Sequence, residues 1–286
     1  MGRIICPKKE GVINFRKIHI RRKNDFNNDR FIIDTMVWSF SRLNSYYNCP
    51  YEWWMNYIQC YPKAQNFFAQ FGSLVHEILE KYEKGELSLF EISQYYEDHF
   101  NEVVYCDAPP NMYTDIRQSY YDKGLDYLDH IDLLLDEYDI LGVEKEVRFK
   151  IGEYDAVGYI DLLLHNKETG AITILDHKSG SIKILKNGNI SKTDQAHFLE
   201  FKRQLYLYSK PVLEEYGHVE FVEWNLFKDR KHLKIEWEKE EYQEALQWAI
   251  ETIELIKKET EWNPHPDFYY CNYLCSQREN ACEYKP

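Results

Sequence analysis

Residues 158–180 read GYIDLLLHNKETGAITILDHKSG, two apolar runs that each carry an aspartate. Asn166 and Gly170 lie between the runs, and both residue types favour turns. The runs are rich in Ile and Leu and have the length of short strands, so the sequence predicts strands over residues 156–164 and 171–178. Two short strands joined by a tight turn indicate part of a sheet.

An acid and a lysine are two residues apart in the second of these strands. Side chains alternate along a strand, so Asp176 and Lys178 are expected to leave the same face. A hairpin pairing would bring Asp161 of the preceding strand beside Asp176. Two carboxylates can hold one divalent cation, and a nearby ammonium can offset charge on a phosphate. Acid-x-Lys triplets occur elsewhere in this chain, as at residues 200–202, so the strand context carries the argument.

The remaining pattern predicts a mixed α/β fold, with a central mixed β-sheet flanked by helices. Apolar residues recur at helical spacing over 67–84, and helical, Tyr-rich sequence continues through a predicted insertion at about 86–140. The other predicted elements are strands 143–151, 219–227 and 232–237 and helices 194–216 and 239–259. Because no repeat or linker interrupts this pattern, residues 35–286 are expected to form a single domain.

Charge is distributed unevenly along the 286 residues. The net charge is -13, yet residues 1–30 carry nine Lys or Arg against three Asp or Glu. We therefore interpret residues 1–34 as a basic N-terminal extension, either solvated or in contact with phosphates. No apolar run is long enough for a signal peptide or a membrane span, so a cytoplasmic location without a membrane partner is expected.

Three of the seven cysteines gather near the C-terminus, at Cys271, Cys275 and Cys282. In a reducing compartment clustered cysteines indicate metal ligands rather than disulfides. A fourth thiolate would complete either a zinc or an iron-sulfur site, and Cys49, at a predicted helix break before Pro50, is the most plausible one. The spacing itself leaves other cysteines open as alternatives: Cys6, Cys60 and Cys106.

Three further side chains become candidates only in context. His76 lies beside the apolar stripe of helix 67–84, where a histidine is more often structural than a metal ligand. Gln204 and Tyr208 are four residues apart and thus share one helical face. From spacing alone, a surface glutamine beside a buried tyrosine is the simpler interpretation.

Taken together, these segments resemble the PD-(D/E)XK nuclease superfamily, in the RecB-like and AddB-like branch that includes the iron-sulfur CRISPR adaptation exonucleases. Residues 39–50 are similar to an opening Ser-x-Ser-x-Leu segment that ends in Cys-Pro, and residues 72–76 are similar to a Gly-x-x-x-His motif. Residues 158–161 and 176–180 match the two acidic motifs. The resemblance covers about residues 39–282 and implies a restriction-endonuclease-like core with a cysteine-clamped, cluster-binding tail at about 262–286.

The resemblance also implies roles for single residues. His76, Asp161 and Asp176 would bind Mg²⁺ or Mn²⁺, together with the backbone carbonyl of His177, and Lys178 would act in catalysis. The other implied positions are Gln204 and Tyr208 as DNA contacts, and Cys49, Cys271, Cys275 and Cys282 as ligands of a 4Fe-4S cluster. The gaps of three and six residues between the tail cysteines depart from the usual spacing, which keeps zinc as the alternative.

The expected activity is therefore that of a metal-dependent DNA exonuclease acting on single-stranded DNA or free ends. Recombination, repair and phage DNA processing are the expected settings, with recombination, helicase or CRISPR adaptation proteins as partners. The alternative is a non-catalytic DNA-binding or partner-docking protein that retains the nuclease fold.

Overall fold

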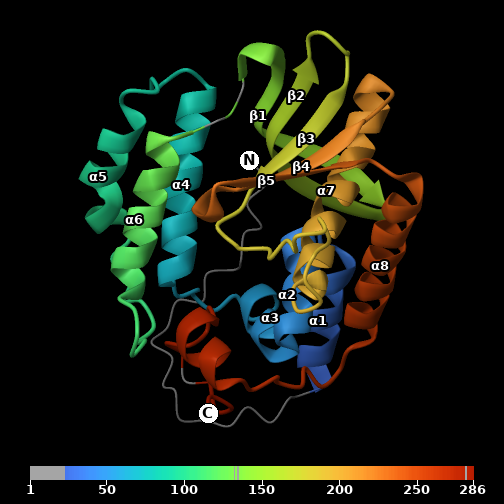
Figure 1. Ribbon diagram of the computed structural model, residues 1–286. Helices are drawn as coiled ribbons and strands as arrows, with labels where there is room; N and C mark the ends of the chain where they lie inside the picture. The colour runs from blue at the N-terminus through green and yellow to red at the C-terminus, as the bar shows by residue number, and fades with distance from the viewer. Residues whose placement is uncertain (1–22, 132, 134, 281) are drawn as a thin grey trace. The chain divides into compact units, whose positions relative to one another are not determined.

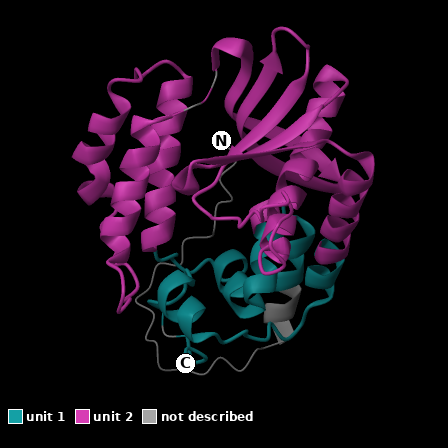
Figure 2. Ribbon diagram, viewed as in Figure 1, with its two compact units in different colours: residues 1–36, 42–64, 253–286 teal, residues 37–41, 65–252 magenta. Residues whose placement is uncertain are grey.

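The computed structural model describes residues 23–131, 133, 135–280 and 282–286 (Figure 1). Two compact units are present (Figure 2). Unit 1 combines the described residues up to Met36 with Arg42–Ala64 and Ile253–Pro286, and unit 2 combines Val37–Ser41 with Gln65–Thr252. Most of the predicted basic extension lies outside the described residues. Among the described helices, none has the length and apolar character needed to cross a membrane.

Along the described chain, a series of α-helices comes first, and strands interspersed with two more α-helices follow. The helices are α1 (Lys23–Asp34), α2 (Phe40–Asn48), α3 (Pro50–Tyr57), α4 (Phe67–Glu83), α5 (Ile92–Val103), α6 (Ile116–Asp129), α7 (Gln195–Tyr216) and α8 (Lys239–Lys258). The strands are β1 (Tyr138–Ile151), β2 (Tyr154–Asn166), β3 (Ile172–His177), β4 (Phe221–Leu226) and β5 (Lys231–Glu236). The predicted mixed sheet with flanking helices is confirmed.

The sheet of unit 2 has the strand order β1-β2-β3-β4-β5. Strands β1, β2 and β3 form an antiparallel meander, whereas β3 and β4 pair in parallel and β4 pairs with β5 in antiparallel fashion. A parallel pair requires a crossover connection, and α7 supplies it. Strand β3 lies at the centre and is buried along its whole length, which explains its continuous apolar sequence.

Strand β1 shows how the sequence pattern selects the buried face. Its last residues alternate between exposed and buried positions, with Val147, Phe149 and Ile151 directed inward. The strand also begins at Tyr138, five residues before the predicted start. The pairing with β2 changes register near Gly142, and such an irregularity hides the early part of a strand from a search for strict alternation.

Helix α4 carries the apolar stripe that was read from the sequence. The Asn66 side chain accepts a hydrogen bond from the Ala69 N–H at 2.9 Å and caps the start of the helix. Gly85 follows the end with φ 72°, a left-handed conformation that suits glycine. Along the stripe, Leu74 and Ile78 are fully buried in a core shared with α5 and α6. Packing against these helices, rather than propensity alone, holds α4 in place.

Unit 1 is built around stacked aromatic rings and a glutamate at the end of α8. The Trp53 and Trp262 rings stack with centroids 5.2 Å apart and planes 9° apart. The Tyr46 hydroxyl donates to Glu259 at 2.9 Å, and Glu259 also accepts the backbone N–H groups of residues 260–262. These contacts fix the direction in which the C-terminal tail leaves α8.

A buried polar chain ties α4 to the central strand. His177 Nε2 lies 2.8 Å from a Glu83 carboxylate oxygen, and both side chains are at most 2% exposed. On the other side of the ring, Asn225 Nδ2 lies 2.9 Å from His177 Nδ1 and donates to the Tyr127 hydroxyl at 2.6 Å. Burial alone would lower the pKa of His177, but the Glu83 charge and its hydrogen bond raise that pKa above its ordinary value. The two side chains therefore form a buried ion pair when the His177 ring is protonated.

We predict that Glu83→Leu lowers the free energy of unfolding by about 3 to 5 kcal/mol, because it leaves a buried charge without its partner. The double variant Glu83→Leu/His177→Phe should regain most of this loss, since both members of the pair are then apolar. Urea denaturation followed by circular dichroism measures both changes. Glu77→Leu, on the exposed side of the same helix, serves as the control and should cost less than about 1 kcal/mol. A Glu83→Leu variant as stable as its control would contradict the ion pair.

Candidate metal and catalytic site

Three metal-ligating side chains converge from three different elements of unit 2. His76 comes from α4, Glu144 from β1 and Asp161 from β2, and one ligand atom of each lies within 4.8 Å of the others. His76 Nδ1 is 3.5 Å from an Asp161 carboxylate oxygen. One imidazole and two carboxylates form a donor set that suits Mn²⁺ and Mg²⁺. The residues that the structure brings together therefore fit a divalent cation.

The strand register explains why Glu144 and Asp161 meet. Val143 pairs with Leu162 and Lys145 pairs with Ile160, so Glu144 stands opposite Asp161 on the neighbouring strand. The backbone of Glu144 has φ 48°, in the left-handed region that costs energy for a residue with a side chain. The surrounding pairs of β1 and β2 hold this conformation in place.

Asp161 and Asp176 are neighbours on β2 and β3, as the hairpin pairing predicted. Leu162 and Leu175 form the last pair of the β2–β3 ladder. Asp161 and Asp176 occupy the next position along the two strands. The His177 backbone N–H donates to an Asp161 carboxylate oxygen at 2.8 Å. Burial and the charge of Asp176 raise the pKa of Asp161 to about 7. A raised pKa of this kind is expected where two carboxylates lie close together.

Asp176 is engaged by a lysine and a glutamine. One of its carboxylate oxygens lies 2.7 Å from Lys178 Nζ, and the other accepts a hydrogen bond from Gln204 Nε2 at 3.0 Å. Lys178 also donates to Gln204 Oε1 at 2.8 Å. The three side chains form a closed set beside Asp161. Asp176 is not among the atoms that meet within 4.8 Å, and its place in a metal site remains a prediction.

His76 is suited to bind a cation at neutral pH. Burial, His177 and Lys178 all lower the pKa of His76 below its ordinary value of 6.5. A neutral imidazole keeps a lone pair available for a metal. The ring is also oriented edge to face against His177, with centroids 5.8 Å apart. Helix α4 thus presents His76 to the sheet in a form that can act as a ligand.

Tyr208 lies beneath the site rather than on an open surface. Its side chain is 6% exposed and packs against Gly158 of β2, where a Cβ atom would lie only 2.3 Å from the Tyr208 ring. This close contact gives the glycine of the Gly-Tyr-Ile-Asp segment a physical role. Gln204, one turn earlier on α7, reaches Asp176 and Lys178 directly. The predicted DNA contacts of Gln204 and Tyr208 remain predictions.

A hollow of about 520 Å³ opens beside the cation ligands. Its lining residues come from α4, β1 and the end of β3: Phe68, Ala69, Gly72, Ser73, His76, Glu77, Glu80, Glu144 and Ser179. Gly72 lets α4 lie close to Ser179, because a Cβ atom at this position would be only 3.3 Å from Ser179 Oγ. Both glycine and serine belong to segments that the resemblance singled out.

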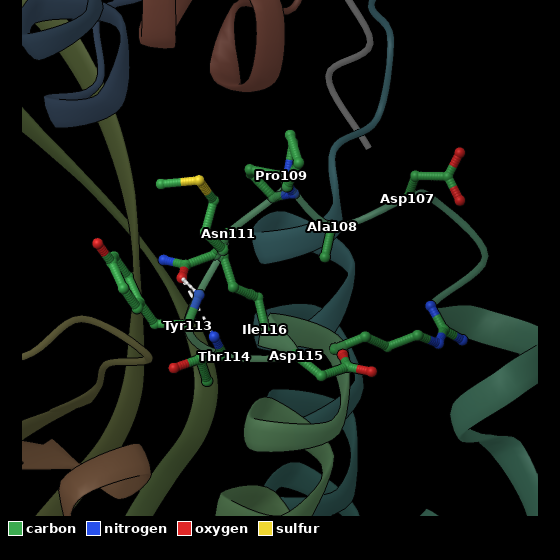
Figure 3. A pocket seen from close by; sticks show the side chains of 11 residues that line it. Asp107, Ala108, Pro109, Asn111, Tyr113, Thr114, Asp115 and Ile116 are labelled. Atoms are coloured by element: carbon green, nitrogen blue, oxygen red, sulfur yellow. Dashed lines mark hydrogen bonds between the residues drawn. The ribbon is translucent and has the colours of Figure 1, made fainter.

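A wider hollow of about 670 Å³ lies elsewhere in unit 2, in the loop between α5 and α6 (Figure 3). Asn111 Oδ1 accepts the backbone N–H groups of Tyr113 and Thr114, as the dashed lines show. Asp115 caps α6 by accepting the Gln118 N–H. The polar groups of this hollow are used to fold the loop itself, so its size does not mark a catalytic site.

In unit 1, four cysteines line one small cavity: Cys49, Cys271, Cys275 and Cys282. Burial and the nearby Glu52 raise the pKa of Cys275 to about 12. Glu52 also accepts hydrogen bonds from the Tyr270 hydroxyl at 2.6 Å and the Ser276 N–H at 2.7 Å. The tail is therefore bound to α3 by a buried carboxylate.

The competing cysteines have other environments. Cys106 donates through its sulfur to the Gln65 carbonyl at 3.3 Å. Cys60 is disulfide-bonded, which departs from the expectation of fully reduced cysteines and removes it as a thiolate ligand. Cys6 lies outside the described residues. Among the described cysteines, the cavity thus gathers the same four that the resemblance implied.

Sequence analysis missed two acidic residues of this region, Glu144 and Glu83. Glu144 lies at a left-handed position in β1, where the alternating pattern gives no signal. An acid on the strand before Asp161 was nevertheless a possible clue, because neighbouring antiparallel strands place such residues opposite each other. Glu83 contacts His177 across 94 residues, a contact that no local pattern reveals.

Comparisons with known proteins identify the family of this chain. The family model described as the PD-(D/E)XK nuclease superfamily matches residues 37–286. Among solved structures, the chain is similar to one from Eubacterium rectale described as a proposed exonuclease, with a TM-score of 0.51 and 14% identity over 94% of this chain and 96% of that chain. No match was found among curated proteins. The extent of the family match, over a fold with a mixed sheet and flanking helices, shows that the chain belongs to the PD-(D/E)XK nuclease superfamily.

Proposed function

We propose that this nuclease is a metal-dependent DNA exonuclease that hydrolyses phosphodiester bonds. The observation that carries the proposal is the convergence of His76, Glu144 and Asp161 within 4.8 Å, next to the pair of Asp176 and Lys178. Hydrolysis of a phosphodiester requires stabilisation of charge on the phosphate and an oriented water. The site offers groups for both tasks within one sheet and one helix.

His76, Glu144 and Asp161 would hold Mg²⁺ or Mn²⁺, with Asp176 and the His177 carbonyl as further proposed ligands. When bound, the cation supplies Lewis-acid stabilisation of the phosphate and lowers the pKa of water for in-line attack. The crowded carboxylates support the assignment. Burial and the charge of Asp176 raise the pKa of Asp161, and a bound cation would lower that pKa again by balancing the two negative charges.

Lys178 would neutralise the negative charge that develops on the phosphate. Its ammonium group is held by Asp176 and Gln204, which fixes its direction before substrate arrives. Gln204 is in this proposal a positioning residue, because it contacts the lysine and the acid. The buried pair of Glu83 and His177 supports the same strand from the other face.

Cleavage from free ends follows from the resemblance and from the name of the similar Eubacterium rectale protein, and the resemblance adds single-stranded DNA as the substrate. Recombination, repair or phage DNA processing would be the setting. The alternative, a non-catalytic DNA-binding protein, is disfavoured because the acids, the histidine and the lysine are all present and directed to one place.

The four cysteines of unit 1 are proposed to bind a 4Fe-4S cluster, with zinc as the alternative. Four thiols around one cavity fit both groups by their chemistry. The resemblance favours the cluster. In either case the metal group would join α3 to the C-terminal tail.

Removal of the lysine should abolish most cleavage. We expect Lys178→Ala to lower kcat by about 10²- to 10³-fold, the loss seen when one group that stabilises transition-state charge is removed. Cleavage of end-labelled single-stranded DNA with Mn²⁺ measures this, and Lys167→Ala, in the turn between β2 and β3, is the control. A circular single strand should resist the wild-type protein. Undiminished cleavage by Lys178→Ala would refute the assigned role, and rapid cutting of circles would refute exonuclease action.

Metal binding should strengthen as the pH rises from about 6 to 8. Asp161 in the metal-free protein has a pKa of about 7, so a cation must displace a proton below that pH and none above it. Calorimetric titration of Mn²⁺ in buffers of different ionisation enthalpy should show proton release at about pH 6 that disappears by about pH 8. Asp161→Asn should remove the release. Equal affinity and no proton release at both pH values would contradict the proposed ligand.

The cysteine site can be identified by its metal content. Anaerobically purified protein is expected to be brown and to contain about four iron and four sulfide per chain, whereas a zinc site would bind about one zinc. Cys275→Ser should lose the metal, and Cys106→Ser, outside the cavity, should retain it. A wild-type protein without iron or zinc would exclude both forms of the proposal.

A further inference from the structure

The segment between β3 and α7, residues 181–194, is a compact loop with an unusual charge. Leu185 N–H donates to the Asn189 carbonyl at 2.8 Å, and Ser191 N–H donates to the Lys183 carbonyl at 2.8 Å, so the loop folds back on itself as a small hairpin. Gly188 at its tip has φ 84°, and Ile182 anchors the base with 1% exposure. We name residues 181–194 the lysine loop.

Three lysines of this loop are exposed: Lys183, Lys186 and Lys192. No described carboxylate forms an ion pair with any of them. The one acid of the loop, Asp194, instead accepts the Lys183 backbone N–H at 2.7 Å and the Thr193 hydroxyl at 2.9 Å. The carboxylate thus accepts hydrogen bonds that shape the loop and lies near the charge of Lys183 without forming an ion pair with it.

Several lysines elsewhere in unit 2 form ion pairs, whereas exposed lysines such as Lys231 and Lys239 form none with a described carboxylate. Lys145 pairs with Glu215 and Lys150 pairs with Asp155. Lys202 likewise forms an ion pair, with Glu241. In a chain with a net charge of -13, a cluster of unmatched positive charges stands out as a region of opposite potential. Such a cluster is complementary to a polyanion.

The lysine loop is connected to the catalytic site at both ends. It begins directly after Ser179 and Gly180, and Ser179 lines the hollow that contains His76. It ends at α7, where the Phe201 ring lies 5.3 Å from Lys178 Nζ. Five residues of chain can extend to roughly 18 Å, so Lys183 lies within a few nucleotides of Lys178.

From this placement we propose that the lysine loop binds the sugar-phosphate backbone of the DNA strand a few nucleotides from the bond that is cleaved. This inference rests on the proposed function and names the surface by which the acidic protein holds its substrate. Lysine side chains contact phosphates without reading bases, so binding through the loop is independent of sequence. Binding through the loop stabilises the bound substrate and the transition state equally, so it raises affinity without raising kcat.

The test compares two variants of equal charge. One carries Lys183→Gln, Lys186→Gln and Lys192→Gln, and the control carries Lys167→Gln, Lys231→Gln and Lys239→Gln at exposed positions outside the loop. Anisotropy of a fluorescent single-stranded oligonucleotide, with Ca²⁺ in place of the catalytic cation, gives Kd over a range of salt concentrations. Thermal melting verifies that both variants are folded.

Each lost phosphate contact lowers the slope of log Kd against log salt by about 0.7, so the loop variant should lose about 2 from the slope. The control variant should keep the wild-type slope. With Mn²⁺, the loop variant should show a raised KM and an unchanged kcat. The single variant Lys186→Gln should lose about 0.7 from the slope.

A loop variant with the slope and KM of the control would overturn the inference while leaving the proposed nuclease function intact. Failure of the wild-type protein itself to bind or cleave DNA would overturn both. An equal loss of slope in the two variants would show that total charge, rather than the loop, governs binding, and would also overturn the inference.

Discussion

The antiparallel pairing of β2 with β3 decides where the charged groups of the site lie. Leu162 stands opposite Leu175, and this register makes Asp161 and Asp176 neighbours. A shift of one residue would send one aspartate to the opposite face of the sheet, since strand side chains alternate. Such a shift would also separate the buried aspartates from the groups that hold them, which are the His177 N–H, Lys178 and Gln204. The register of β2 and β3 thus sets the distance between the two acids.

The cost of crowding these acids is met by groups around them. The His177 N–H donates to Asp161, and Lys178 and Gln204 hold Asp176. Beneath them, the ion pair of His177 with Glu83 fixes β3 to α4, the helix that also bears His76. A preorganised arrangement of this kind keeps the ligand geometry stable, and the crowded negative charge that raises the pKa of Asp161 also attracts a cation.

Much of the fold could be predicted from sequence because its signals are local. The stripe of helix α4, the two apolar runs of β2 and β3 and the turn at Gly170 each follow from short-range periodicity. The adjacency of Asp161 and Asp176 followed from a hairpin, also a local element.

What the sequence could not reveal depends on distant or irregular contacts. Glu144 reaches the site through a left-handed residue in β1, and Glu83 meets His177 only after α4 packs on the sheet. Tyr208 could be placed on a helical face, yet its burial against Gly158 required the three-dimensional structure. The disulfide bond of Cys60 also could not be predicted from residue spacing. Tertiary packing or an irregular backbone decides these features, and residue spacing gave at most a clue to Glu144.

The most direct test of the account is the position of a bound cation. Crystals of the protein soaked in Mn²⁺ would be measured near the manganese absorption edge, and an anomalous difference map would locate the ion. The account predicts a peak in contact with His76, Glu144 and Asp161. A well-ordered site at these residues without a peak, or with manganese bound only elsewhere, would contradict it.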